Sequence, residues 1–201
     1  MNPFHLLFLS LLALGFSGQP AAFRSAAPIE ASALVAAPAG TTPDDDQIIP
    51  WVPDVRLNWQ DFQCTPLHGT DAVASTSTSL GIAYQVVNGH LSYHITCNFA
   101  KNKSWGLMKT EYILAHEQGH FDITEIFARR LNEALNNYQF NRHSFKRDIN
   151  EIYQSIVAEK EDYQQRYDGE TDHSRNRRVQ YEWLDRIQSM LDETASYASY
   201  P

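Results

Sequence analysis

The hydrophobic pattern of this 201-residue chain changes near residue 108, and that change constrains the fold more than any other feature. From about residue 50 to 106, polar and apolar residues alternate as they do in strands buried on one face. Val55–Trp59 predicts the first such strand. Asn88 and Gly89 stand between two alternating runs and predict a tight antiparallel hairpin.

Beyond this point, apolar residues recur at helical spacing and predict three helices, over residues 109–139, 144–167 and 175–193. The second helix is expected to stop at Asp168-Gly169, because a glycine just past the last turn is a common C-terminal signal. A small antiparallel sheet followed by three helices is an α+β arrangement.

The N-terminal region predicts export. Residues 6–16 are apolar apart from one serine, too few to span a bilayer, and residues 1–17 fit a signal peptide cleaved after Ser17. Residues 18–47 are rich in Ala, Pro, Thr and Asp and predict a disordered tether. Residues 48–201 then form one domain, expected in the periplasm or outside the cell, with no integral membrane segment after signal cleavage.

The charge of the chain disfavours two classes of partner. The formal net charge is −8, and no stretch concentrates Lys and Arg. Nucleic acids and anionic membrane surfaces attract proteins through basic patches, so neither is expected as a partner.

A metal-binding motif lies inside the first predicted helix, at His116-Glu117-Gln118-Gly119-His120. At about 100° per residue, His120 lies about 40° around the helix from His116 and one turn further on, so both imidazoles can bind one ion. Glu117 lies beside the pair, where a carboxylate can take a proton from water. The spacing predicts one Zn²⁺ per chain with Glu117 as the general base.

The rest of the helix supports this interpretation. Both histidines lie on an apolar stripe, where an unpaired polar group costs about 1–3 kcal/mol and a metal would satisfy it. The stripe includes Ile113, Phe127, Leu131 and Leu135. The opposite face is polar and expected to face solvent; it carries Gln118, Asp122, Glu125 and Arg129. The alternative is a pair of core histidines bonded to carbonyl groups or tyrosines.

A catalytic zinc site needs a third protein ligand. Asp122 and Glu125 lie on the polar face, and Glu125 is spaced to pair with Arg129. The metzincin pattern fails, because Ile123 and Ile126 stand where its glycine and third histidine would be. The third ligand is therefore expected further along the chain.

The turn after the second predicted helix is the best source of that ligand. If the first two helices pack antiparallel, this turn returns to the half of the first helix that carries the histidines. His173 is the first candidate. The alternatives are acidic residues of the turn or of the second helix: Asp168, Glu170, Asp172, Glu151 and Glu159. The turn could also be a solvated connection with no ligand.

The residues from His116 to Ile123, with Ala128-Arg129 beyond them, resemble a bacterial domain family of unknown function described as predicted secreted zinc-dependent proteases. The likeness continues at Trp59–Phe62, at Ser104-Trp105 and at 167–173. It implies a zincin-like core with the motif on the first long helix, a peptidase activity, and His173 as the third ligand. Two positions where the family has glycine differ: they are Cys64 and Ser174.

Two cysteines in an exported chain favour one disulfide, Cys64–Cys97, and the departure from the family at Cys64 supports it. A buried pair of free thiols is the alternative.

These observations predict an exported zinc metallohydrolase, most simply a peptidase acting on a peptide or protein substrate. Tyr167 is a possible oxyanion donor; otherwise it is the last apolar contact of its helix. Two alternatives remain: a non-catalytic periplasmic zinc-binding or regulatory module, and a zinc-dependent hydrolase of a non-peptide amide.

Overall fold

The computed structural model describes residues 47–66, 69 and 72–201. The predicted signal peptide and the predicted tether up to residue 46 lie outside these residues, so the expectations about export are proposals.

The main sheet has three antiparallel strands in the order β1-β4-β3, formed by β1 (Ile48–Pro50), β3 (Thr78–Val87) and β4 (His90–Ala100). The predicted hairpin is confirmed: β3 and β4 pair along their whole length, and Asn88 and Gly89 form the turn with φ of 52° and 80°. Two successive positive φ angles match the twist of a two-residue hairpin, which is why this sequence pair is favoured there.

A second, two-stranded sheet lies at the other end of the hairpin. It pairs β2 (Ala74–Ser75) with β5 (Trp105–Gly106), and the short helix η2 (Lys101–Lys103) joins β4 to β5. The strands before residue 108 and the helices after it confirm the predicted α+β class.

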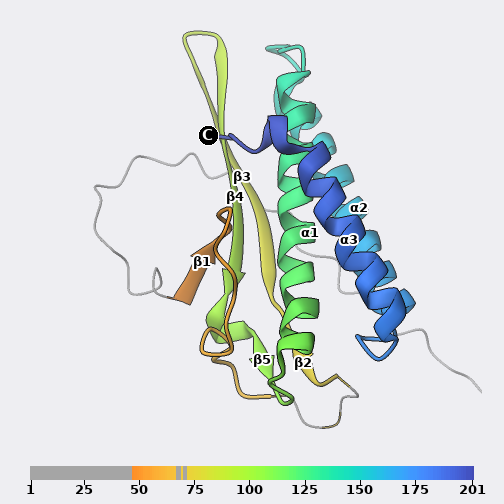
Figure 1. The fold of residues 1–201 in the computed structure, drawn as a ribbon. Helices are drawn as coiled ribbons and strands as arrows, with labels where there is room; N and C mark the ends of the chain where they lie inside the picture. The colour runs from red at the N-terminus through yellow and green to blue at the C-terminus, as the bar shows by residue number, and fades with distance from the viewer. Residues whose placement is uncertain (1–46, 67–68, 70–71) are drawn as a thin grey trace, which may run out of the picture. The chain divides into compact units, whose positions relative to one another are not determined.

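Three helices follow, α1 (Glu111–Asn136), α2 (Phe145–Thr171) and α3 (Arg177–Glu193), with the short helix η3 (Ala195–Tyr197) after them. The first of them lies between the sheet on one side and α2 and α3 on the other, as Figure 1 shows. It is therefore the central element of the core. Of the helices that the structure describes, none combines the length and the apolar character that crossing a membrane requires.

One face of the main sheet packs against α1. The buried residues on this face alternate along β3 and β4, as expected for strands with one solvated face. They are Leu80, Ile95, Cys97 and Phe99.

The first predicted strand is wrong. Val55–Trp59 forms no strand, and the short β1 precedes it. The amide of Leu57 donates to the side chain of Gln118 at 2.9 Å, and Arg56 forms an ion pair with Asp122 at 3.1 Å. The segment therefore bonds to side chains of α1 and does not join a sheet.

The predicted solvent face of α1 is also wrong. Asp122 and Glu125 are 7% and 1% exposed, because the N-terminal segment, the sheet and the C-terminal tail cover this side. Asp122 accepts a hydrogen bond from Trp51, and Glu125 is held by Tyr200 and by Arg129, its predicted partner. Hydrogen bonds of this kind are what allow carboxylates to be buried.

The second helix runs further than predicted. It continues through Gly169 to Thr171, and Asp172 ends it in the left-handed conformation with φ of 49°. The backbone amide of Asp172 donates to the carbonyl oxygen of Gly169. As a result, Asp168 lies on the last turn of α2 and not in a loop.

The predicted Cys64–Cys97 disulfide is absent, and both thiols are free. Cys97 lies three residues before the end of β4, about 10 Å back along the strand, and is buried in the core. Cys64 lies in the loop beyond that end, with its amide bonded to the carbonyl of Ser104. The two cysteines therefore lie in different segments, one in the core and one in a loop, whereas a disulfide requires their Cα atoms within about 7 Å.

The free thiols predict a stepwise alkylation. Iodoacetamide should modify Cys64 in the folded protein and Cys97 only after denaturation, since Cys97 is buried and burial, with nearby Glu125, raises the pKa of its thiol. Intact-mass measurement should show one adduct before guanidinium and two after it, with or without prior reduction. A protein that takes up no adduct until it is reduced would contain the disulfide instead.

Candidate metal centre

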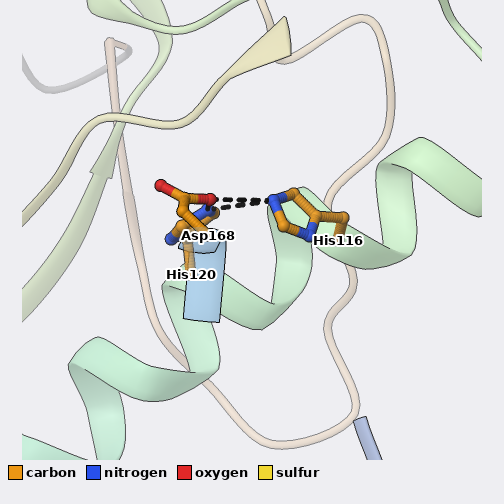
Figure 2. Close-up of side chains that lie close together, drawn as sticks. All are labelled: His116, His120 and Asp168. Atoms are coloured by element: carbon orange, nitrogen blue, oxygen red, sulfur yellow. Dashed lines mark hydrogen bonds and ion pairs between the residues drawn. The ribbon is translucent and has the colours of Figure 1, made fainter. Parts of the chain in front are cut away.

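Three side chains from two helices converge at one point. His116 and His120 project from α1, and Asp168 projects from the last turn of α2, as Figure 2 shows. The Nε2 atoms of the histidines lie 3.1 and 3.0 Å from the same carboxylate oxygen, Oδ1 of Asp168. The two Nε2 atoms are 3.3 Å apart. Among the described residues, this is the one group of three whose ligand atoms could share a metal ion.

The size of this triangle fits a tetrahedral ion. Ligand atoms that bind zinc at about 2.0–2.1 Å are separated from one another by about 3.3 Å along each edge of the tetrahedron. The three observed separations, between 3.0 and 3.3 Å, are within a few tenths of an ångström of that edge. Two imidazoles and a carboxylate are also a common ligand set of catalytic zinc.

Gln164 fixes the proton on His120. Its amide nitrogen donates to the backbone carbonyl of His120 at 2.9 Å, and a carbonyl can only accept, so the orientation of this amide is determined. The amide oxygen of Gln164 then faces Nδ1 of His120. His120 must therefore carry a proton on Nδ1 and direct Nε2 towards Asp168.

A longer chain of hydrogen bonds fixes His116 in the same way. The hydroxyl of Tyr167 donates to the carbonyl of His116 at 3.2 Å, so it must accept from the amide nitrogen of Gln180 at 2.7 Å. The amide oxygen of Gln180 then accepts from Nδ1 of His116, also at 2.7 Å. Such outer partners commonly hold the imidazole ligands of a metal.

Three acceptors thus face one another, two imidazole lone pairs and a carboxylate oxygen, and a cation must separate them. Burial lowers the pKa of His120, but its bond with Asp168 and the nearby Glu117 outweigh burial and raise that pKa. Burial also raises the pKa of Asp168, yet the hydrogen bonds of the two histidines hold it well below its usual range. The same three ligand atoms could therefore share a proton or hold a metal ion, both of which are positively charged.

Gly119, inside the motif, allows the two helices to approach. A Cβ at this position would lie 2.5 Å from the hydroxyl oxygen of Tyr167. The ring of Tyr167 stacks on His116 with centroids 4.5 Å apart and meets His120 edge-on at 5.0 Å. The glycine thus lets Tyr167 support both imidazoles.

This packing corrects the predicted role of Tyr167. Its side chain is fully buried, and its hydroxyl is already engaged with Gln180 and with the carbonyl of His116. Burial raises the pKa of this hydroxyl far above its usual value. Tyr167 therefore positions the histidines and does not face a substrate.

Glu117 lies beside the three ligand atoms without joining them. It is 4% exposed, and its carboxylate accepts a hydrogen bond from Thr76 at 2.7 Å. Thr76 directly follows β2, so the carboxylate is held from the sheet side. The bond from Thr76 is accepted by one of the two carboxylate oxygens of Glu117, Oε2.

A cleft of about 700 Å³ opens over the site. Residues 72–78 form one wall and the last three turns of α2 form the other, with His116, Glu117 and His120 at the bottom. The carboxylate of Asp168 is about one-third exposed there, while the side chains of the two histidines are 5% and 14% exposed. The ligand atoms therefore meet where a small molecule or an extended chain could reach them.

The predicted third ligand, His173, lies outside the group of three. Its side chain is 56% exposed at the rim of the cleft, and its Nδ1 is 3.7 Å from Oδ1 of Asp168. Asp168, one of the acidic alternatives, occupies the position that was expected for His173. The remaining alternatives are engaged elsewhere or face solvent: Glu170 with Trp183, Asp172 with Arg175, and Glu151 and Glu159 on the exposed side of α2.

Three positioning residues have no counterpart in the predicted site: Thr76, Gln164 and Gln180. Gln164 could have been found, because it lies one turn before Asp168 and shares its face of α2. Thr76 and Gln180 reach the site from other elements, and nothing in their local sequence distinguishes them.

Comparison with known proteins identifies a family but no activity. Residues 54–174 match DUF922, a family of bacterial proteins of unknown function. No curated protein and no solved structure matches the chain. The resemblance seen in the sequence is therefore confirmed as a bacterial domain of unknown function, and the protease description stays a prediction.

The geometry predicts which carboxylate holds the metal. Asp168→Ala should abolish stoichiometric zinc binding, as His116→Ala should, because each removes one corner of the triangle. Metal per chain after gel filtration, measured by mass spectrometry of the elements, checks this. Asp162→Ala is the matched control, an exposed aspartate on the same helix, and should retain the metal. Retention of one metal by the Asp168 variant would contradict the assignment.

The helix contact predicts opposite effects for two glycines. Gly119→Ala should lower the free energy of unfolding by about 1–3 kcal/mol, because Tyr167 must move, and should weaken zinc binding with it. Gly169→Ala, in the same pair of helices, meets nothing within 4 Å and should instead stabilise by about 0.5–1 kcal/mol. Thermal and urea unfolding measure both. Equal changes in the free energy of unfolding for the two variants would show that Tyr167 does not restrict the size of residue 119.

Proposed function

This chain belongs to the DUF922 family of bacterial proteins of unknown function, and we propose that it is a zinc-dependent metallohydrolase that cleaves peptide bonds. One observation carries the proposal: three ligand atoms with the spacing of a tetrahedral site open into a cleft beside a buried glutamate. In this proposal the sheet, α1 and α2 form a zincin-like core.

His116, His120 and Asp168 would hold the ion, with each imidazole oriented by a glutamine. A bound zinc ion would supply Lewis acidity, polarising a carbonyl and making water more acidic. Glu117 takes one proton from the attacking water and later gives it to the leaving amine. Thr76 keeps the carboxylate beside the cleft for both transfers. The same ligand set also suits non-haem iron, and metal analysis of the purified protein distinguishes the two.

The wall of the cleft favours an extended peptide as substrate. The carbonyl oxygens of Val73 and Ser77 accept from Leu107 and Ala100, so odd-numbered residues direct their backbone groups towards β5 and β4. Because backbone directions alternate along a strand, we expect Ala74 of β2 to direct its backbone groups to the opposite edge, which would face the cleft. An extended chain could pair with this edge and pass over Glu117.

The main alternative is a non-catalytic zinc module. A structural zinc site is closed by a fourth protein ligand. The described residues contribute three, and the buried glutamate at the open side suits a reaction better than a structural role. A peptidase assay together with the metal content decides between the two.

The proposal includes export. The predicted signal peptide over residues 1–17 suits a small hydrolase in the periplasm or outside the cell. Cleavage after Ser17, observed by N-terminal sequencing of protein from the native compartment, tests this part by itself.

Glu117→Gln should retain one zinc per chain while turnover falls by about 10² or more, because the amide cannot accept the proton of water. Metal content and an unbiased peptide-cleavage profile should be measured on the same preparation. Glu111→Gln is the matched control, an exposed glutamate at the start of the same helix, and should cleave at the wild-type rate. Unchanged turnover in Glu117→Gln would reject the mechanism, and loss of zinc would make Glu117 a ligand.

A further inference from the structure

We propose that His173 is a catalytic residue that donates a hydrogen bond to the carbonyl oxygen of the substrate as negative charge develops on it. This inference rests on the proposed hydrolase function and gives His173 a role different from that of a metal ligand.

His173 lies next to the three ligand atoms, on the side of the cleft. His173 lines the cleft together with Ser174, and its imidazole is more than half exposed there. Nδ1 lies 3.7 Å from the same Asp168 oxygen that both histidines approach at about 3 Å. The ring is therefore adjacent to the ligand triangle, on the cleft side, without being one of its corners.

Glu117 and His173 approach the cleft from different sides. Glu117 lies at the bottom of the cleft, and Thr76 holds its carboxylate from the side of the wall formed by residues 72–78. His173 follows α2 and belongs to the other wall. A carbonyl group bound between the walls would have the proton acceptor on one side and an N–H donor on the other. Hydrogen-bond donors placed where charge develops contribute much of the rate of acyl-transfer enzymes.

The backbone of the turn that carries His173 has an unusual conformation. Three successive residues, Asp172, His173 and Ser174, have φ of 49°, 50° and 70°, a left-handed conformation that side chains other than glycine rarely adopt. Such conformations persist where the surroundings enforce them, and they cluster at functional sites.

The surroundings of this turn enforce its shape. The amide of His173 donates to the carbonyl of Asp168 at 2.9 Å, which ties the turn directly to a proposed ligand. The hydroxyl of Tyr112, on the first turn of α1, donates to the carbonyl of Ser174. Both helices that carry the ligands therefore hold the turn that presents His173.

Hydrolysis of the peptide bond in this site does not consume the imidazole proton of His173. The oxygen of water bonds to the carbonyl carbon, one water proton moves to Glu117, and the π electrons of the carbonyl move onto its oxygen, which accepts the hydrogen bond from His173. The C–N bond then breaks, the nitrogen takes the proton from Glu117, and the carbonyl re-forms as a carboxylic acid. His173 keeps its proton throughout.

The test compares His173→Ala and His173→Gln with wild type and with His143→Ala, an exposed histidine in the α1–α2 connection. All four are prepared as the full chain with zinc. Four quantities are measured: zinc per chain, the affinity for inorganic phosphate by calorimetry, and kcat and KM on a peptide from the cleavage profile. Phosphate is the probe for a tetrahedral, negatively charged group.

We expect one zinc in every variant, phosphate binding about tenfold weaker in His173→Ala, and kcat lower by about 10² with KM little changed. His173→Gln, which keeps an N–H donor, should recover part of both losses, and His143→Ala should match wild type.

Loss of zinc from His173→Ala would overturn the proposal, because His173 would then be a ligand. Wild-type phosphate affinity in His173→Ala, or no phosphate binding by the wild type, would overturn it as well. If no peptide is cleaved by any form, the proposed hydrolase function fails, while the zinc and phosphate measurements still decide the place of His173.

Discussion

The site depends on the close contact of α1 and α2 at Gly119. The ligand triangle has two corners on one helix and one on the other, so its size is set by the distance between the helices. Tyr167 determines that distance, because its hydroxyl lies only 2.5 Å from where a Cβ of residue 119 would be, and its ring stacks on His116. Asp168 follows Tyr167 directly in the sequence. Tyr167, which sets the spacing of the helices, therefore also positions Asp168.

The rotation of α1 about its own axis is fixed from the opposite side. Asp122 is bonded to Trp51 and Arg56 of the N-terminal segment, and Glu125 is bonded to Tyr200 near the end of the chain. Breaking any of these bonds would leave a buried carboxylate without its partner, which is costly. These pairs keep the histidine face of the helix directed at α2 and at the cleft.

The sequence predicted the parts of this structure that depend on local pattern. The hairpin at Asn88-Gly89 and the placing of His116 and His120 on one face of a helix follow from periods of two and 3.6 residues. The buried polar face of α1 could not be predicted in this way. Its charged residues look solvated until the segments that cover it, which lie far away in the sequence, are known.

The identity of the third ligand residue also could not be predicted from the local sequence pattern. The antiparallel packing of the helices correctly indicates the end of the second helix, and Asp168 is among the predicted candidates. With that helix predicted to stop at Asp168-Gly169, Asp168 and His173 belong to one turn, and the family resemblance favours His173. The helix instead runs to Thr171 and ends at Asp172. Asp168 then faces α1, whereas His173 lies past the end, at the rim.

A carboxylate at the third corner also balances the charge of the site. Glu117 is 4% exposed and its hydrogen bond comes from Thr76, a neutral group, so its negative charge requires a positive charge nearby. In the proposed site, a divalent ion held by two neutral imidazoles and Asp168 would leave one positive charge, which Glu117 would cancel. Three neutral histidines would leave two, and the site with Glu117 would keep a net charge of one in a poorly solvated place. The proposed site with Asp168 would be neutral before the reaction, so the negative charge that develops on a substrate oxygen would need a donor of its own, and His173 is an exposed imidazole beside it.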